Sequence, residues 1–338
     1  MPILGQGIIP ASGAIAQELT SVVRRAYMPR VYVQIWKAAP LMACLMSAAQ
    51  VATGGLSPIT TPVQGAPMVN GQWVDYSGSF DQPGVMPGIQ NAEFNLKAFC
   101  TPIPFLGMEG LVQLDYSVVP LIDARMNDAT NVTIDTFALT LYNNVANTQQ
   151  MIGLPAAIDD GTFALTYGGI NRQQNQFWKS VYVHNPGNVT PTRNLMLQYI
   201  AQTTKVTGEM PQIGIVGFGT WTLLAQDFTP NERYVINPGD RLDASADFVG
   251  HSSFQALDIA GIPFYADPYC PEGELFIINT GYLSLFLHER AAFTFTGFES
   301  TLPNNQFGYI SAILTLLELV NVKPKCHAKI DGLQFLNI

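Results

Sequence analysis

The stretch SVVPLIDARMNDATNVTIDTFALTLYNNVAN, residues 117–147, carries the strongest regular pattern in the chain. Ser117 is a typical helix N-cap, and Pro120 is tolerated in a first turn, where its missing N–H would have no partner. At 1.5 Å per residue, the stretch predicts a single helix about 45 Å long, more than a small domain needs. The apolar residues that recur at helical spacing are Val118, Ile122, Met126, Ala129, Ile134, Ala138, Leu141 and Val145.

Before this helix, residues 51–97 combine glycines and prolines with short β-like runs at 59–61 and 73–80. This pattern predicts a long two-stranded β-excursion. Because an isolated hairpin is only marginally stable in water, we expect it to rest on a neighbouring chain. The alternative is an internal hairpin whose aromatic residues pack on their own domain. The candidate contacts with a neighbour are Trp73, Tyr76 and Phe80.

The first 50 residues contain short helical patches interrupted by Pro29 and Pro40. Such a segment has too little apolar surface for a core of its own and must lie on something else. Its large aromatics, Tyr32 and Trp36, are therefore two further candidate intersubunit contacts.

After the long helix, residues 191–299 read as a mixed α/β unit. Its expected helices cover Asn194–Thr204 and the positions of Phe218, Trp221, Leu224 and Phe228, and its expected strands are Ile213–Val216, Phe254–Ile259, Ile262–Ala266, Leu275–Asn279 and Leu283–His288. The run from Ile310 fits a strand buried on both faces, although a helix also fits its spacing. We favour the strand because the run ends in Val320, Val322 and Pro324.

The composition is poor in charge. Charged residues make up only 12% of the 338 residues, about half the usual share of roughly 25%. Cores of protein–protein interfaces are depleted of charged residues, so we expect other subunits to cover much of this surface. The net charge of −9 argues against a protein that grips nucleic-acid phosphates, and any contact with DNA should be weak and non-specific.

The sequence offers no clear export, membrane or metal signal. The four cysteines, Cys44, Cys100, Cys270 and Cys326, form no CxxC pair, which favours folding in a reducing cytoplasm. No apolar run approaches the ~20 residues of a membrane-spanning helix, and no signal-peptide layout begins the chain. The four histidines, His184, His251, His288 and His327, lie far apart, so we expect no metal site.

Enzyme-like motifs are weak. The stretch IGIVGFGTWTLL places Gly217-x-Gly219 between a strand and a helix, as in dinucleotide-binding folds, but Thr222 occupies the third glycine position. A tight strand-to-helix turn is the favoured interpretation, and a nucleotide-binding oxidoreductase is the alternative. Asp159-Asp160 reads as a solvated turn, and Asp240, Asp243 and Asp247 read as a surface loop without an ordered Ca²⁺-ligand pattern. We therefore expect no catalytic residue and no cofactor.

The order of these parts resembles the major capsid proteins of tailed bacteriophages, which share the Hong Kong ninety-seven-type fold. YGGINRQQNQFWKSVY, residues 167–182, is similar to a Gly-Gly-Ile-(Asn/Asp)-Arg…Phe-Trp stretch in that family. IAGIPFYADPYCPEGELFIINTGYLSLFLH, residues 259–288, is similar to its axial-domain hairpin. The resemblance implies an α+β fold with an N-terminal arm (1–50), an extended loop (51–97), a peripheral domain with a spine helix (98–190), an axial domain (191–299) and a C-terminal strand returning to the peripheral domain (300–338).

The resemblance also implies a function. Copies of the chain would form hexameric and pentameric capsomers of an icosahedral phage head around double-stranded DNA, assembled in the host cytoplasm and retained in the virion. Scaffolding, portal and decoration proteins are the implied partners, and no membrane is involved. Residues 53–96 contain neither Lys nor Arg, so the Lys–Asn crosslink of the founding member is not expected. An encapsulin-type cellular compartment is the alternative shell.

Overall fold

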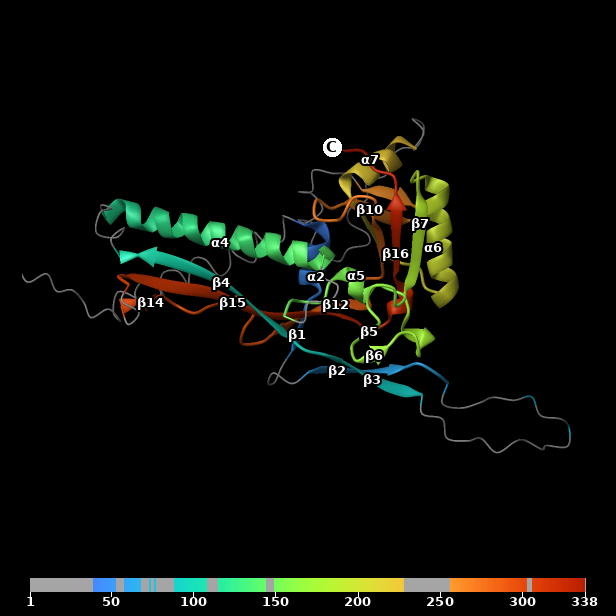
Figure 1. The fold of residues 1–338 in the computed structure, drawn as a ribbon, viewed down its shortest axis with the longest axis horizontal. Helices are drawn as coiled ribbons and strands as arrows, with labels where there is room; N and C mark the ends of the chain where they lie inside the picture. The colour runs from blue at the N-terminus through green and yellow to red at the C-terminus, as the bar shows by residue number, and fades with distance from the viewer. Residues whose placement is uncertain are drawn as a thin grey trace, which may run out of the picture.

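The computed structural model describes residues 39–52, 58–67, 73, 76, 88–107, 115–143, 149–227, 256–302 and 306–337, with the backbone alone for 115–124. Figure 1 shows two sheets, a long helix over the first of them, and a hairpin that projects from the body.

The first sheet is built around the long strand β15 (Gly308–Asn321). Along one edge of β15 runs β4 (Lys97–Leu106), antiparallel, with Lys97 opposite Leu317 and Leu106 opposite Gly308. The other neighbours are β12 (Leu283–His288), β13 (Thr294–Phe295) and β14 (Glu299–Ser300), all antiparallel, while β1 (Gln50–Ala52) pairs parallel with β12.

The predicted long helix is confirmed as α4 (Asp115–Asn143), 29 residues that lie along β4 and β15 (Figure 1). It begins two residues earlier than expected, so Ser117 is the third helical residue and not the N-cap. Its buried side chains, among them Ile134 and Phe137, join Ile103 and Ile313 of the sheet in one hydrophobic cluster. Residues 144–148, which the prediction included, lie outside the described part of the chain.

The second sheet has the order β7–β16–β11–β8–β10–β9. These strands are β7 (Val181–Val189), β16 (Ala328–Leu333), β11 (Leu275–Ile278), β8 (Ile213–Val216), β10 (Ile262–Ala266) and β9 (Leu257–Ile259). The predicted helices are present as α6 (Arg193–Thr207) and α7 (Phe218–Gln226), whose apolar sides pack on this sheet. Thr192 caps α6 by accepting a hydrogen bond from the N–H of Leu195, and Gly208 ends the helix at a φ of 76°. Phe228 lies outside the described residues.

The strand interpretation of the run from Ile310 is right, but burial on both faces holds only for its end. From Ile310 to Leu316 the residues of one parity are buried and the others are exposed or half-buried, whereas Leu317–Asn321 are buried throughout. The second face is covered there because the short helix α5 (Leu154–Ala157) and the residues before it pack on β15.

The chain passes more than once between the two sheets: β1 and β4 lie in the first, β7 to β11 in the second, β12 to β15 in the first again, and β16 in the second. β12 and β13, from the range 191–299, belong to the first sheet, whereas β7, from the range 98–190, belongs to the second. Of the C-terminal range 300–338, β15 thus returns to the sheet under α4, while β16 lies inside the other sheet. The expected segment boundaries do not coincide with the sheets, because pairing joins strands far apart in sequence.

The β-excursion forms a hairpin of β2 (Ile59–Gln64) and β3 (Ile89–Phe94), with Ile59 opposite Phe94 and Gln64 opposite Ile89. The second strand is therefore Ile89–Phe94, and the structure places Trp73 and Tyr76 outside any strand. The remaining elements are α2 (Pro40–Ser47), β5 (Thr166–Tyr167), β6 (Ile170–Asn171), η1 (Gln176–Trp178) and η4 (Pro324–Cys326).

Candidate assembly surfaces

The loop carried by the hairpin presents aromatic side chains to solvent. Trp73 is 104% exposed and Tyr76 is 106% exposed relative to a reference chain. Exposed Trp and Tyr are the residues most often found as energetic anchors of protein interfaces. Phe80, Tyr32 and Trp36, the other three predicted contacts, lie outside the described residues.

A second apolar surface is the face of the β4–β15 pair turned away from α4, which we call the open face. Residues of β4 alternate, so that Thr101, Ile103 and Phe105 are buried under α4 while their neighbours are exposed. The exposed residues of the open face are Ala98, Cys100, Pro102, Pro104, Leu106 and Ile310. It carries no charged residue. Leu106 is 59% exposed and Ile310 42%.

Within the described ranges no strand pairs with the outer edge of β4, and this edge is protected against pairing with another strand. Pro102 and Pro104 lack the N–H that an added strand would need. The carbonyl oxygen of Pro104 is already occupied, because it accepts a hydrogen bond of 2.7 Å from Nη1 of Arg125. Contact at this sheet is therefore favoured through the open face and disfavoured through edge-to-edge hydrogen bonding.

The stretch that carries the family resemblance forms a compact unit, residues 157–178, which we call the cradle. Gly168 and Gly169 have φ of 57° and 77° and make the tight turn between β5 and β6. Arg172 is fully buried and donates hydrogen bonds to the carbonyl oxygens of Ala157, Ala164 and Trp178. The arginine of the Gly-Gly-Ile-Asn-Arg stretch thus holds three separate backbone segments together.

The expected solvated turn at Asp159-Asp160 is wrong for Asp159, which is 0% exposed. Its Oδ2 accepts N–H groups of Gly161, Phe163 and Ala164 and lies 3.6 Å from Nη1 of Arg172. Local polarity misled the prediction, because a buried carboxylate needs a distant cation and several backbone donors that sequence spacing does not reveal.

The Gly217-x-Gly219 motif has a structural explanation. β8 leads into Gly217, the N-cap of α7, and the carboxylate of Glu272 accepts the N–H groups of Gly219 (3.0 Å) and Thr220 (3.2 Å). A side chain at Gly219 would collide with the carbonyl oxygen of Leu336. The chain's own carboxylate thus occupies the helix N-terminus where a pyrophosphate would bind, which favours the tight-turn interpretation.

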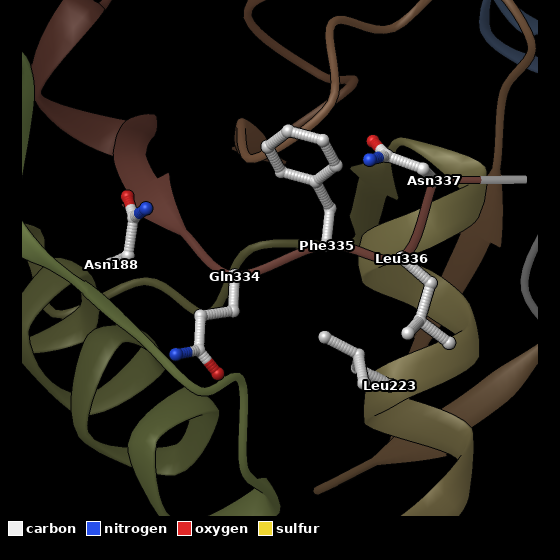
Figure 2. Close-up of a pocket in the computed structure, with 6 residues that line it drawn as sticks. All are labelled: Asn188, Leu223, Gln334, Phe335, Leu336 and Asn337. Atoms are coloured by element: carbon white, nitrogen blue, oxygen red, sulfur yellow. The ribbon is translucent and has the colours of Figure 1, made fainter.

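An open cavity of about 360 Å³ lies beside α7 and the C-terminal tail (Figure 2). Its described lining holds three amide and three apolar side chains and no ionisable group: Asn188, Leu223, Gln334, Phe335, Leu336 and Asn337. Such a lining offers no acid, base or nucleophile.

Across the described part of the chain, no group of three or more His, Cys, Asp or Glu residues is arranged to hold a metal ion. No helix within those residues is long and apolar enough to cross a bilayer.

Glu318 is the main ionisable group that sequence reasoning missed. It is 0% exposed on β15, and its Oε1 accepts the N–H groups of Ile152 (2.8 Å) and Leu319 (3.1 Å). Among the residues that the structure describes, its Oε2 finds no hydrogen-bond partner. Burial raises the pKa of this carboxyl from 4.5 to about 7, against the opposing effect of the two N–H groups and Lys97. The apolar residues around Glu318 in the sequence indicate that it is buried, but they do not reveal that its pKa is raised.

We expect Glu318→Gln to flatten the dependence of stability on pH. Because the folded-state pKa is raised, the folded protein favours the protonated carboxyl of Glu318. Its contribution to the free energy of unfolding is therefore complete below pH 4.5 and is lost as pH rises from 4.5 through about 7. The loss is about 3 kcal/mol at 1.36 kcal/mol per pKa unit. Urea unfolding of dissociated subunits at several pH values measures it, with the exposed Glu299→Gln as control. Parallel pH profiles for wild type and Glu318→Gln would contradict the assignment.

A long helix on one sheet, a second sheet with two helices, and a projecting hairpin define the α+β Hong Kong ninety-seven-type fold of tailed-phage capsid proteins. Solved structures carry this identification. A chain of the cyanophage A-1(L) capsid matches with a TM-score of 0.66 and 14% identity, covering 88% of this chain and 93% of that one. A capsid chain of the native GTA particle matches with a TM-score of 0.58 and 10% identity, covering 86% and 90%.

A third match is a chain from the Gordonia phage Cozz structure, with a TM-score of 0.53, 8% identity and 85% coverage of both chains. No protein-family model matches the sequence, and no curated protein is similar to it at the sequence level. At these identities the likeness establishes the fold, and the function has to be argued from the surfaces.

Proposed function

We propose that this chain is a major capsid protein that self-assembles into the icosahedral head shell of a tailed phage and encloses double-stranded DNA. The observation that carries the proposal is a capsid fold over 88% of the chain. The exposed aromatic residues of the hairpin loop and the uncharged open face add support, because a protein that stays alone seldom leaves such surfaces uncovered.

In this proposal, subunits form hexamers and pentamers, and the loop of one subunit lies over its neighbour. Many weak contacts then add to a stable shell through avidity. Trp73, Tyr76 and Phe80 of the loop, with Tyr32 and Trp36 of the N-terminal arm, make the contacts, and the open face receives a neighbouring chain. The segments 1–50 and 51–97 serve as arm and extended loop, the sheet under α4 belongs to the peripheral domain, and the second sheet belongs to the axial domain.

The chain acts as a structural protein and not as an enzyme, and it contacts packaged DNA only non-specifically, in line with its net charge of −9. Its other partners are scaffolding, portal and decoration proteins. Assembly takes place in the host cytoplasm, and the protein remains in the virion capsid.

The test is expression of the chain, alone and with the scaffolding protein of its own phage, followed by light scattering and electron microscopy. We expect closed megadalton particles of uniform size that contain DNA when the packaging machinery is present. A monomer under all of these conditions would defeat the proposal. Particles that co-purify with an enzyme cargo and no phage DNA would identify an encapsulin-type compartment instead.

Cys100 offers a second test, because it is the exposed cysteine while Cys44, Cys270 and Cys326 are buried. We expect a maleimide to label Cys100 rapidly in dissociated subunits and at least about tenfold more slowly in shells, since access controls the reaction. The three buried thiols serve as internal controls, and burial raises the pKa of Cys44 to about 11. Equal labelling rates in the two states would show that the open face stays uncovered.

A further inference from the structure

The hairpin is held to the cradle at several points along its length. The N–H of Glu93 donates to the carbonyl oxygen of Gly168 at 3.0 Å. The rings of Phe94 and Tyr167 lie 5.1 Å apart, and a side chain at Gly168 would come within 2.8 Å of Phe94. These contacts fix the root of the hairpin where β3 continues toward β4.

A different contact lies at the far end of the paired strands, where the chain leaves β2. Gly65 follows directly after β2, and its N–H donates to the carbonyl oxygen of Gly88 at 2.9 Å. The ring of the half-buried Phe177 presses against the backbone of Gly65, so that an added methyl group would lie 2.5 Å from Cδ1 and Cζ. Beside it, Nε2 of Gln90 donates to Oδ1 of Asn175 at 3.2 Å.

The residues behind Phe177 are held by burial and by several hydrogen bonds. Trp178 is fully buried, its Nε1–H donates to the carbonyl oxygen of Tyr167 at 2.9 Å, and its own carbonyl oxygen accepts from Arg172. The cradle is in turn tied to β15, because the N–H of Asn321 donates to the Tyr167 hydroxyl and the Asn321 side chain donates to the carbonyl oxygen of Ala157. The backbone that carries Phe177 is therefore tied to β15 through the cradle, and the ring of Phe177 packs against the backbone of Gly65.

We propose that Phe177 is a positioning residue whose contact with Gly65 sets the direction in which the hairpin loop leaves the subunit, and through it the curvature of the shell. The inference rests on the proposed function. Trp73 lies eight residues beyond Gly65 and can reach up to about 27 Å from it at the extended length per residue. A rotation of about 10° at Gly65 then displaces Trp73 by as much as about 5 Å, enough to move it out of a pocket on a neighbour.

The test compares Gly65→Ala, Phe177→Ala and the double variant, with Gly187→Ala as the matched control because a methyl group there meets nothing within 4 Å. Particle diameters are measured by electron microscopy, and the thermal unfolding of dissociated subunits is measured in parallel. We expect Gly65→Ala to lower the fraction of particles in the main size class at least about threefold. The reason is that a free-energy cost of about RT for each misplaced loop contact lowers the population of the correct assembly by about that factor. Subunit unfolding should stay close to wild type.

The double variant should return toward the wild-type diameter, because the methyl group fills the space vacated by the ring. Phe177→Ala alone adds no bulk and should broaden the size distribution, so it keeps the test decisive even if Gly65→Ala does not fold. Unchanged diameters in both single variants, or a Gly65→Ala defect that persists in the double variant, would overturn the inference. A wild-type chain that forms no particles would refute the proposed function itself.

Discussion

Replacing Trp73 by alanine is expected to raise the subunit concentration needed for shell assembly at least about 30-fold. Truncating an aromatic hot spot costs about 2 kcal/mol or more, and every 1.4 kcal/mol is a factor of ten. The side chain is 104% exposed in the single subunit, so the free energy of unfolding should change by less than about 0.5 kcal/mol. Sedimentation of subunits and shells over a concentration series measures the assembly threshold.

Trp73→Phe is the control, because it keeps an aromatic side chain and should recover most of the assembly. The fluorescence of Trp73 gives an independent readout and should shift to shorter wavelength when a neighbour covers the ring. An unchanged threshold for Trp73→Ala would refute its role as an intersubunit contact, although the shell function could still stand.

Arg172→Leu is expected to destabilise the folded subunit by about 3–5 kcal/mol, the usual cost of removing one partner of a buried ion pair. The substitution leaves the carboxylate of Asp159 in the interior without its cation and removes one hydrogen bond from each of three carbonyl oxygens, of which that of Ala157 still accepts from the Asn321 side chain. The guanidinium also lies over the ring of Tyr167, 5.0 Å from its centroid. Urea unfolding of dissociated subunits measures the loss.

Arg290→Leu makes the same chemical change at an exposed position and should alter the unfolding free energy by less than about 0.5 kcal/mol. Arg172→Lys should recover little, because an ammonium group cannot direct donors to three carbonyls as the planar guanidinium does. A variant Arg172→Leu with wild-type stability would show that the cradle does not depend on this residue.

Much of the local structure follows from patterns in the chain. The spacing of residues 117–147 predicted α4, and the runs at 213–216, 262–266 and 283–288 were predicted with the bounds that β8, β10 and β12 have. Helices and buried strands are recognisable because periodic apolar residues face one core over many turns or pleats. The order of these elements, with the Gly-Gly-Ile-Asn-Arg stretch, also led to the capsid fold.

Prediction failed where the outcome depended on distant partners. The second strand of the hairpin proved to be Ile89–Phe94, because Phe94 and Ala92 fit against Gly168 more than 70 residues later. Asp159 proved buried because Arg172 pairs with it. Periodicity reports which side of an element is apolar, but not what covers that side.

The amino-acid order alone therefore established the long helix α4, the helices α6 and α7, strands such as β8, β10 and β12, and their order along the chain, since each of these depends on patterns within a short stretch. It also established the low share of charged residues, which follows from composition. Pairing of β16 with β7 and β11, the closure of the motif at Gly217 by Glu272, and the contact of Phe177 with Gly65 came only from the folded chain. The reason is that loop closure brings these groups together across tens of residues, and no local spacing encodes which distant group arrives.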